Sequence, residues 1–218
     1  MSDKLIHTNK NNPISDAEKA DRIMKASVHY GDFLKALGFD WETDPNAHDT
    51  PRRVSKSFLD DLAVGCFTQA PNATAFENVD KYDGIVAQTN IPLVSLCAHH
   101  FLPFTGLAHV GYIPRADGKV IGLSKINRIV DWLARRPQCQ EGLTSAIHEK
   151  IDEVCGDNEG VAVVVEAKHT CCSNRGIKHD STMRTAKMSG AFHESGDNSR
   201  AEFYKFIEFA RSESNKSF

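Results

Sequence analysis

Residues 161–167 read Val-Ala-Val-Val-Val-Glu-Ala, a nearly continuous apolar run rich in β-branched side chains. Such a run predicts a β-strand, because branched side chains fit the pleated surface of a sheet. A strand with one face in water would alternate apolar and polar residues, so this strand is expected to be covered on most sides. The polar cluster His169-Thr-Cys-Cys172 follows it and places chemically reactive side chains at its end.

Two amphipathic helices are predicted ahead of this strand. The first spans residues 122–133 and carries an apolar stripe made of Leu123, Ile126, Ile129, Val130 and Leu133. The second starts at residue 140, ends at Gly156, and has the inward-facing residues Leu143, Ile147, Ile151 and Val154. Because residues three and four positions apart share one side of a helix, each helix presents one apolar face to the core.

Further strands complete the pattern around these helices. They are predicted at residues 85–96 and 104–113 before the helices and at residues 184–193 after the central strand. A terminal helix is predicted at residues 201–211. The order strand-strand-helix-helix-strand-strand-helix indicates a protein of the α+β class.

The N-terminal part of the chain has a different sequence pattern. Ser15 and Glu18 have the spacing of a capping box, and Thr50 followed by Pro51 is typical of a second helix start, with Thr50 as the N-cap residue and Pro51 at the first helical position. The sequence therefore predicts a flexible N-terminal arm at residues 1–14, a helical region at 15–83, and a catalytic domain with a terminal helix at 84–218.

Composition narrows the class of protein. The chain has 218 residues, is 40% hydrophobic and has a net charge of -3, which predicts a sizeable core and gives no reason to expect nucleic-acid or membrane affinity. No apolar run approaches the roughly 18–20 residues that span a bilayer. The first residues lack the apolar centre of a signal peptide, so a cytoplasmic location is expected. Its six cysteines are then expected to be free thiols or metal ligands.

Two short clusters suggest a metal site. Cys97 and His100 are three residues apart, a spacing that lets both side chains reach one ion from a tight turn. His169 and Cys171 are two residues apart and share a face if the chain there is extended, whereas Cys172 would point away. We therefore predict Cys97, His100 and Cys171 as ligands of a zinc ion that keeps a fourth position open, as catalytic zinc does. The alternatives are core cysteines beside ordinary histidines, or a closed structural site.

Such a site would leave His99 and His169 free for proton transfer. Zinc lowers the pKa of a bound water to about 7. An imidazole with an ordinary pKa near 6.5 can give or take a proton beside it. This combination predicts hydrolysis at an electrophilic carbon.

Several polar residues at predicted helix starts suggest an anionic substrate. Ser124, Lys125 and Arg128 lie in the first turns of a helix, where free N–H groups favour anions. Arg175 follows the second cluster and Arg53 lies at another helix start, so these residues together could hold a polyphosphate. Each of them taken alone is better explained as a solvated charge.

Glu141 lies where the second of the two helices starts. The helix dipole alone explains many carboxylates at such positions. A carboxylate there could instead accept two hydrogen bonds from a guanidine-like edge, such as N1–H and the 2-amino group of guanine. The residues alone leave both explanations open.

Several of these motifs resemble GTP cyclohydrolase I, and they occur in the order found in that family. The resemblance runs from about residue 18 to residue 211 and rests on Thr50-Pro-Arg-Arg-Val54, Cys97-x-His-His100, Gly122-Leu-Ser-Lys-Ile-Asn-Arg-Ile-Val130, Arg136-Pro-Gln-Cys-Gln-Glu-Gly-Leu-Thr144, Glu166-Ala-Lys-His-Thr-Cys171 and Arg175-Gly-Ile177. It implies hydrolytic opening of the guanine imidazole ring of GTP, release of formate and formation of 7,8-dihydroneopterin triphosphate.

The resemblance also implies residue roles and a fold. Cys97, His100 and Cys171 match zinc ligands, and His169 and His99 match groups that transfer protons. Gln140 and Glu141 match a guanine-recognising pair, and the triphosphate contacts are matched by Ser124, Lys125, Arg128, Arg175 and Arg53. The implied fold is the tunnelling fold, an antiparallel four-stranded sheet with two helices on one face, assembled as a homodecamer of two pentamers. Active sites between subunits are implied as well.

Two positions depart from the family pattern. Ala98 stands where an acidic residue is usual, and Gly142 stands where arginine is usual.

Two other functions are alternatives to this one. One is a related enzyme of the same fold that handles a pterin or deazaguanine. The other is a zinc-stabilised assembly or binding module without catalytic activity.

Overall fold

The structure is a computed structural model that describes residues 5–194 and 198–214. It divides into two compact units, one ending at Gln69 and the other beginning at Ala70. Residues 1–4 of the predicted N-terminal arm lie outside the described residues. Within the described ranges, no helix is both long and apolar enough to cross a membrane.

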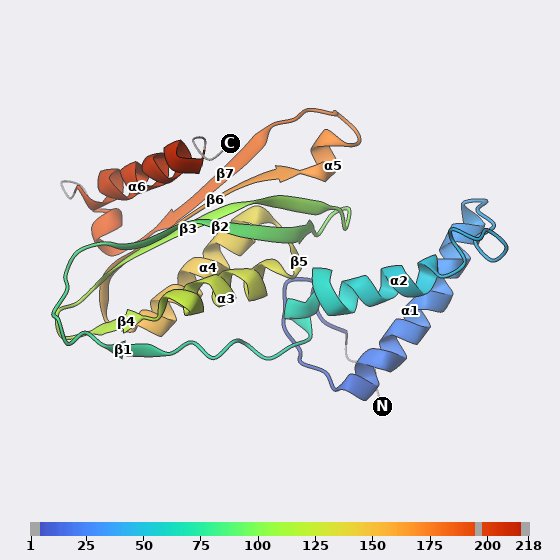
Figure 1. Ribbon diagram of the computed structural model, residues 1–218, viewed down its shortest axis with the longest axis horizontal. Helices are drawn as coiled ribbons and strands as arrows, with labels where there is room; N and C mark the ends of the chain where they lie inside the picture. Colours follow the sequence, from blue (N-terminus) through green and yellow to red (C-terminus); the bar gives the residue numbers. More distant parts are fainter. Residues whose placement is uncertain (1–4, 195–197, 215–218) are drawn as a thin grey trace. The chain divides into compact units, whose positions relative to one another are not determined.

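The first unit is helical (Figure 1). Its helix α1 (Asp16–Ala36) packs against α2 (Thr50–Ser57), which continues into the π-helical turn η1 (Phe58–Leu62) and the 3-10 turn η2 (Val64–Cys66). The predicted start of α1 is confirmed, because the Ser15 hydroxyl accepts a hydrogen bond of 3.2 Å from the Glu18 amide. The side chain of Asn11 donates to backbone carbonyls of Gly65 and Thr68 and so ties the segment before α1 to η2.

The second unit is built on one mixed sheet. Its four long strands β2 (Val86–Cys97), β3 (Pro103–Pro114), β6 (Asn158–His169) and β7 (Thr182–Met188) are antiparallel neighbours in the order β2-β3-β6-β7. The predicted four-stranded antiparallel sheet and the α+β class are therefore confirmed. The two-residue strand β5 (Pro137–Gln138) adds a parallel pairing at the end of β2, and β1 (Ala75–Glu77) pairs separately with β4 (Lys119–Ile121).

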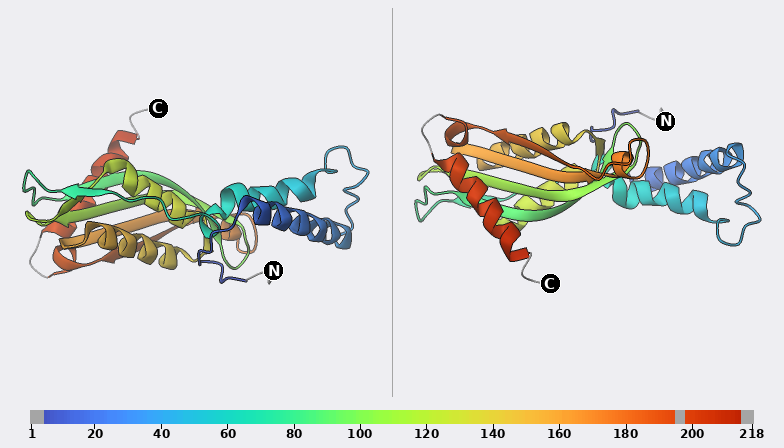
Figure 2. Two further views of the ribbon diagram at one scale, coloured as in Figure 1. Left: turned by 90° about the horizontal axis from the view of Figure 1, so that it is seen from below. Right: turned by 90° about the horizontal axis from the view of Figure 1, so that it is seen from above.

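Helices cover both faces of this sheet. Figure 1 shows α3 (Leu123–Ala134) and α4 (Gln140–Cys155) on one face and α6 (Ser199–Ser214) on the other. Figure 2, seen from above, shows α6 lying across the strands. Alternate residues of β6 explain its uninterrupted apolar run, because Val163 and Val165 pack in the core with α3 and α4, whereas Ala162 and Val164 pack in the core with α6.

Three details differ from the predictions. The fourth strand ends at Met188 instead of continuing to residue 193, because Gly190 turns the chain at a φ of 55° into the 3-10 turn η3 (Gly190–Phe192). Leu123 was predicted to face the core, but it is the first residue of α3 and is 68% exposed, so the buried stripe of that helix begins at Ile126. Thr50 was expected to cap α2, whereas the helix includes it and Asp49 takes the capping position.

The terminal helix is held to the sheet by apolar contacts and by one buried carboxylate. A Cβ atom at Gly111 would lie 2.8 Å from the ring of Phe203, so glycine allows α6 to approach β3 closely. On the same face, Glu166 accepts hydrogen bonds from Arg184 at 2.7 Å and from the buried His109 at 3.2 Å, and it pairs with Arg211 of α6. Burial opposes ionisation of Glu166, but Arg211 and Arg184 outweigh it and lower its pKa to about 2.

Replacing this carboxylate is expected to lower stability in a pH-dependent way. The folded pKa of Glu166 lies below its ordinary value of 4.5, so its contribution is complete above that value and is lost as the pH falls toward 2. Denaturant unfolding should show Glu166→Gln to be less stable than wild type by about 2–3 kcal/mol at pH 7, with the gap closing in acid.

Glu159→Gln is the matched control, because Glu159 forms only an exposed ion pair with Arg115. That substitution should change the free energy of unfolding by less than about 0.5 kcal/mol. A gap between wild type and Glu166→Gln that stays constant from pH 7 to pH 3 would contradict this account of how α6 is anchored.

Candidate metal centre and substrate pocket

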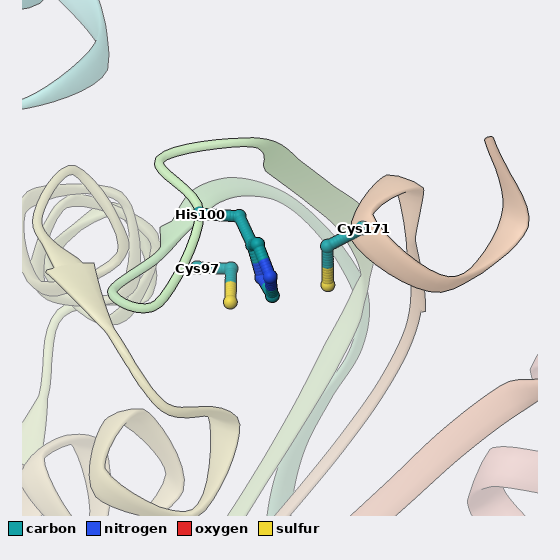
Figure 3. A group of neighbouring side chains, drawn as sticks. All are labelled: Cys97, His100 and Cys171. Atoms are coloured by element: carbon teal, nitrogen blue, oxygen red, sulfur yellow. The ribbon is translucent and has the colours of Figure 1, made fainter. Parts of the chain in front are cut away.

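Three side chains converge beyond the ends of β2 and β6. Cys97 is the last residue of β2, His100 lies in the turn that follows, and Cys171 lies in the short helix α5 (Thr170–Ser173). One donor atom of each lies within 4.8 Å of the others, and Figure 3 shows the three side chains pointing the same way. Four-coordinate zinc, with bonds of about 2.0–2.3 Å, holds its donors about 3.5–3.8 Å apart, so small side-chain rotations bring the group onto one ion.

The backbone explains why these residues meet. The β2–β3 hairpin closes directly after Cys97: the Cys97 amide donates to the Leu102 carbonyl at 2.9 Å, and the Phe101 amide donates to the Cys97 carbonyl at 2.9 Å. This places Cys97 and His100 in one turn. The pairing of β3 with β6 sets Phe104 opposite His169, the last residue of β6, and α5 follows at once.

The chain around Cys171 differs from the prediction in one respect. An extended chain was expected through residues 169–172, whereas Thr170–Ser173 form one helical turn. The turn nevertheless brings the Cys171 thiol to Cys97, and Cys172 is not part of the convergent group. All six cysteines, each of them a described residue, are free thiols.

The chemistry of the donors fits a bound cation. Burial, together with the neighbouring thiols of Cys97 and Cys172, raises the pKa of the Cys171 thiol to about 11. The Cys171 thiol therefore resists ionisation on its own, and a divalent cation would reverse that preference because it deprotonates a thiol that binds it. Two sulfurs with one imidazole form a donor set that zinc accepts.

The two remaining histidines border the same group in different environments. His99 is exposed, with Nδ1 at 3.6 Å from the Cys97 sulfur and Nε2 at 4.0 Å from the Cys139 sulfur. His169 is half-buried and stacks on Phe104, with ring centroids 4.4 Å apart and planes 12° apart. Burial lowers the pKa of His169 below its ordinary 6.5, and the nearby Glu141 opposes this shift only in part.

These groups line one pocket. Its volume is about 350 Å³, and its wall includes Cys97, His99, Glu141, His169 and Cys171. Glu141 is exposed in the first turn of α4, so its carboxylate is available to a ligand. Such a volume lies within the range of small-molecule sites in proteins.

Arg175 is brought to this site, whereas three other predicted phosphate contacts are not. The Arg175 guanidinium donates to Nε2 of His100. The opposite end of the sheet holds the start of α3, because Asn127 accepts a 2.6 Å hydrogen bond from Gln88, nine residues before Cys97 on β2. Nine residues of strand span about 30 Å. The residues at that remote end are Ser124, Lys125 and Arg128.

Arg53 belongs to the other unit. It lies on α2, where its Nε donates to the Asp49 carboxylate at 3.0 Å.

Two residues that contact the histidines of the site, Phe104 and Cys139, received no role from the sequence. Phe104 supports the His169 ring. Its role depends on the antiparallel register of the sheet, which pairs the residue after Pro103 with the end of β6. Cys139 faces His99, and no local pattern pointed to it.

A group of three donors that could hold a metal ion, in the wall of a pocket with two further imidazoles, is an arrangement suited to a metal-dependent hydrolytic enzyme. Comparison with known proteins identifies the family to which this enzyme belongs. The sequence model of the family described as GTP cyclohydrolase I matches residues 26–208. This chain belongs to the GTP cyclohydrolase I family.

Curated relatives agree over nearly their full length. GTP cyclohydrolase 1 of Flavobacterium johnsoniae is 38% identical over 216 residues, covering 95% of this chain and 93% of the relative. GTP cyclohydrolase 1 1 of Pseudomonas syringae pv. tomato is 48% identical over 184 residues, covering 82% and 94%. GTP cyclohydrolase 1 of Thermoanaerobacter pseudethanolicus is 40% identical over 192 residues, covering 88% and 97%.

Proposed function

We propose that this member of the GTP cyclohydrolase I family hydrolyses GTP at a zinc centre held by Cys97, His100 and Cys171. The reaction opens the guanine imidazole ring, releases formate and forms 7,8-dihydroneopterin triphosphate, the first step of tetrahydrofolate and pterin biosynthesis. The observation that carries the proposal is the convergence of these three donors in the wall of a pocket that also contains His169 and Glu141. The three donors would hold a zinc ion there, and such an ion would supply a Lewis acid that lowers the pKa of a water molecule.

His169 is the residue proposed to move protons at the guanine ring. Its half-buried ring is expected to be neutral at pH 7, because burial lowers its pKa below the ordinary value of 6.5. Nε2 lies 2.9 Å from the Gln140 side-chain oxygen and holds the ring proton in that bond, so Nδ1 carries the lone pair. We assign to Nδ1 the transfer of a proton from the attacking water, whose hydroxide adds to the ring carbon, to N7 as the ring opens. His99 is proposed to assist proton transfers near the ribose.

Glu141 is proposed to recognise the guanine base. Its carboxylate stands exposed in the first turn of α4 beside the pocket. A carboxylate can accept hydrogen bonds from N1–H and the 2-amino group together, and such charge-assisted pairs are about twice as strong as neutral ones. The base would then present its imidazole edge to the metal group.

The triphosphate site is proposed to be completed by another copy of this chain. Arg175 lies beside the metal group, whereas Ser124, Lys125 and Arg128 lie at the opposite end of the same sheet. A single chain therefore gathers only part of the predicted phosphate contacts among the described residues of its second unit. We propose a homo-oligomer, a decamer of two pentamers as the family resemblance implies, with Arg53 also contributing to a site.

A cytoplasmic location is proposed on chemical grounds. Zinc thiolates require reduced cysteines, and the cytoplasm keeps thiols reduced. The substrate GTP is also a nucleotide of that compartment. The six free thiols are consistent with this proposal.

The function is tested by incubating the purified zinc-loaded protein with GTP. The expected products are one formate for each GTP consumed and, after mild oxidation, a fluorescent pterin that retains the triphosphate. Release of inorganic phosphate or pyrophosphate without formate would contradict ring opening. GTP incubated without protein provides the background rate.

Glu141→Ala is expected to raise KM for GTP by about 30–150-fold, which corresponds to the 2–3 kcal/mol of a charge-assisted hydrogen-bonded pair. The variant should keep its zinc, because Glu141 is not among the three converging donors. It should also lose the preference for GTP over inosine triphosphate, which lacks the 2-amino group. Steady-state kinetics with both nucleotides and zinc analysis measure these effects.

Glu153→Ala is the matched control. Glu153 lies on the same helix and forms a 2.7 Å ion pair with Lys150 at an exposed position, so KM should stay at the wild-type value. A wild-type KM for GTP in Glu141→Ala would show that the base is recognised elsewhere.

A further inference from the structure

We propose that Gln140 is a positioning residue that fixes the tautomer of His169, and that it does not itself contact guanine. The proposal rests on the proposed function, since it concerns how one residue of that site is prepared for proton transfer. The family resemblance places Gln140 with Glu141 in base recognition, but the two neighbours differ in the structure. Glu141 is exposed, whereas Gln140 is 1% exposed.

The surroundings of Gln140 determine which way its amide faces. Its nitrogen Nε2 lies 3.0 Å from the Val165 carbonyl, 3.2 Å from the Met183 carbonyl and 3.1 Å from the Thr185 hydroxyl. A carbonyl oxygen can only accept a hydrogen bond, so the donor end of the amide must lie on this side. The opposite orientation would bury the amide oxygen against two carbonyl oxygens.

The hydroxyl groups of Thr144 and Thr185 extend this hydrogen-bond network, and the donor in each of their bonds can be assigned. The Thr144 hydroxyl donates to the Gln140 backbone carbonyl at 2.9 Å, which uses its single proton. Thr185, whose hydroxyl is 2.6 Å from that of Thr144, therefore donates to Thr144. The oxygen of Thr185 is then left to accept from the Gln140 amide. Each of the two hydroxyl protons therefore has one acceptor, and the two amide protons of Gln140 are shared among the Val165 carbonyl, the Met183 carbonyl and the Thr185 hydroxyl.

The orientation of the Gln140 amide determines which nitrogen of His169 carries the proton. The side-chain oxygen of Gln140 lies 2.9 Å from Nε2 of His169 and can only accept, so Nε2 must carry a proton. In the neutral ring the lone pair is then on Nδ1. The stacking of the ring on Phe104 fixes its plane, with centroids 4.4 Å apart. Tautomer and ring plane are thus both set before substrate arrives, which is the preorganisation that proton transfer benefits from.

A direct contact of Gln140 with guanine would break this arrangement. Both ends of its amide are occupied by protein atoms of β6, β7 and His169. Turning it toward a ligand would break the buried hydrogen bond to the Val165 carbonyl and would leave Nε2–H of the half-buried His169 without its acceptor, and removing the partner of a buried polar group is costly. Base recognition by Glu141 needs no such rearrangement.

The experiment compares Gln140→Met with the wild-type zinc-loaded protein. Methionine has a similar length and offers no comparable hydrogen bond, so His169 keeps its neighbours and loses only the acceptor for Nε2–H. We expect kcat to fall by about 10–100-fold, as for other residues that orient a reactive histidine, while KM for GTP stays within about threefold. A KM raised more than tenfold at unchanged kcat would overturn the proposal, because it is the result expected for a guanine contact.

The second readout is the tautomer itself, measured by NMR of protein labelled with ¹⁵N and ¹³C in histidine, with His169→Asn identifying the signal. At pH 8 the wild-type ring should be the Nε2–H form, and Gln140→Met should show a mixture. A wild-type ring protonated at Nδ1 would overturn the proposal. This wild-type measurement holds even if Gln140→Met does not fold. It also separates the two proposals, since absence of formate production by the wild type refutes the function without changing the tautomer.

Discussion

Replacement of Cys171 by serine is expected to remove the zinc ion and to lower turnover of GTP by at least about 10³-fold. Cys171 supplies one of the three donors that converge among the described residues, and a serine hydroxyl at neutral pH is a poor substitute for a thiolate. Loss of the Lewis acid forfeits several kcal/mol of transition-state stabilisation, and about 4 kcal/mol corresponds to that factor. Zinc analysis and GTP kinetics on the same preparation measure both effects.

Cys172→Ser is the matched control because it makes the same chemical change at the adjacent position. Cys172 is exposed and is not part of the convergent group, so this variant should keep one zinc ion per chain. Circular dichroism should show both variants to be folded, since Cys171 is only partly buried. Retention of zinc by Cys171→Ser, or its loss from Cys172→Ser, would mean that the ligand set is wrong.

His169→Ala is expected to keep its zinc and to lose about 10²–10⁴-fold in kcat, the usual contribution of a general acid–base. The imidazole is stacked on Phe104 and hydrogen-bonded to Gln140 at the wall of the pocket, but it does not belong to the group of converging donors. The variant should therefore bind zinc but fail to open the guanine ring, because the group that transfers the proton is missing. Kinetics with GTP and zinc analysis on one sample separate this outcome from metal loss.

The matched control for this histidine is His193→Ala. His193 is exposed after the turn η3, and it does not line the pocket. Its replacement should leave kcat, KM and zinc content at wild-type values. If zinc were lost from His169→Ala, the imidazole would be a ligand and its proposed role in proton transfer would be wrong.

Much of the fold followed from local patterns. The run at residues 161–167 predicted a strand covered on most sides, and β6 has this property because α3 and α4 pack on one face and α6 on the other. The packing of α6 was not predictable, since it depends on contacts far apart in sequence. Gly111 admits the ring of Phe203, and Glu166 meets Arg211. No spacing within one segment signals either contact.

In the site, too, some features were predictable from local sequence patterns and others depended on contacts far apart in the sequence. Cys97 and His100 share one turn, so their spacing alone predicted that they could meet. Cys171 was selected on the assumption of an extended chain, whereas α5 is helical, because the conformation after a strand depends on its neighbours. The bond from His169 to Gln140 joins the end of β6 to the start of α4 and required the assembled sheet. Sequence reasoning could therefore name the residues more readily than their partners.

Zinc K-edge X-ray absorption spectroscopy of the purified, active protein measures the proposed zinc ligands directly. We expect one zinc ion with two sulfur atoms at about 2.3 Å and two nitrogen or oxygen atoms at about 2.0–2.1 Å. One of the two lighter atoms is expected to be the His100 nitrogen and the other an exchangeable water oxygen. A shell of four sulfur atoms, or full GTP turnover by protein that contains no metal, would contradict this expectation.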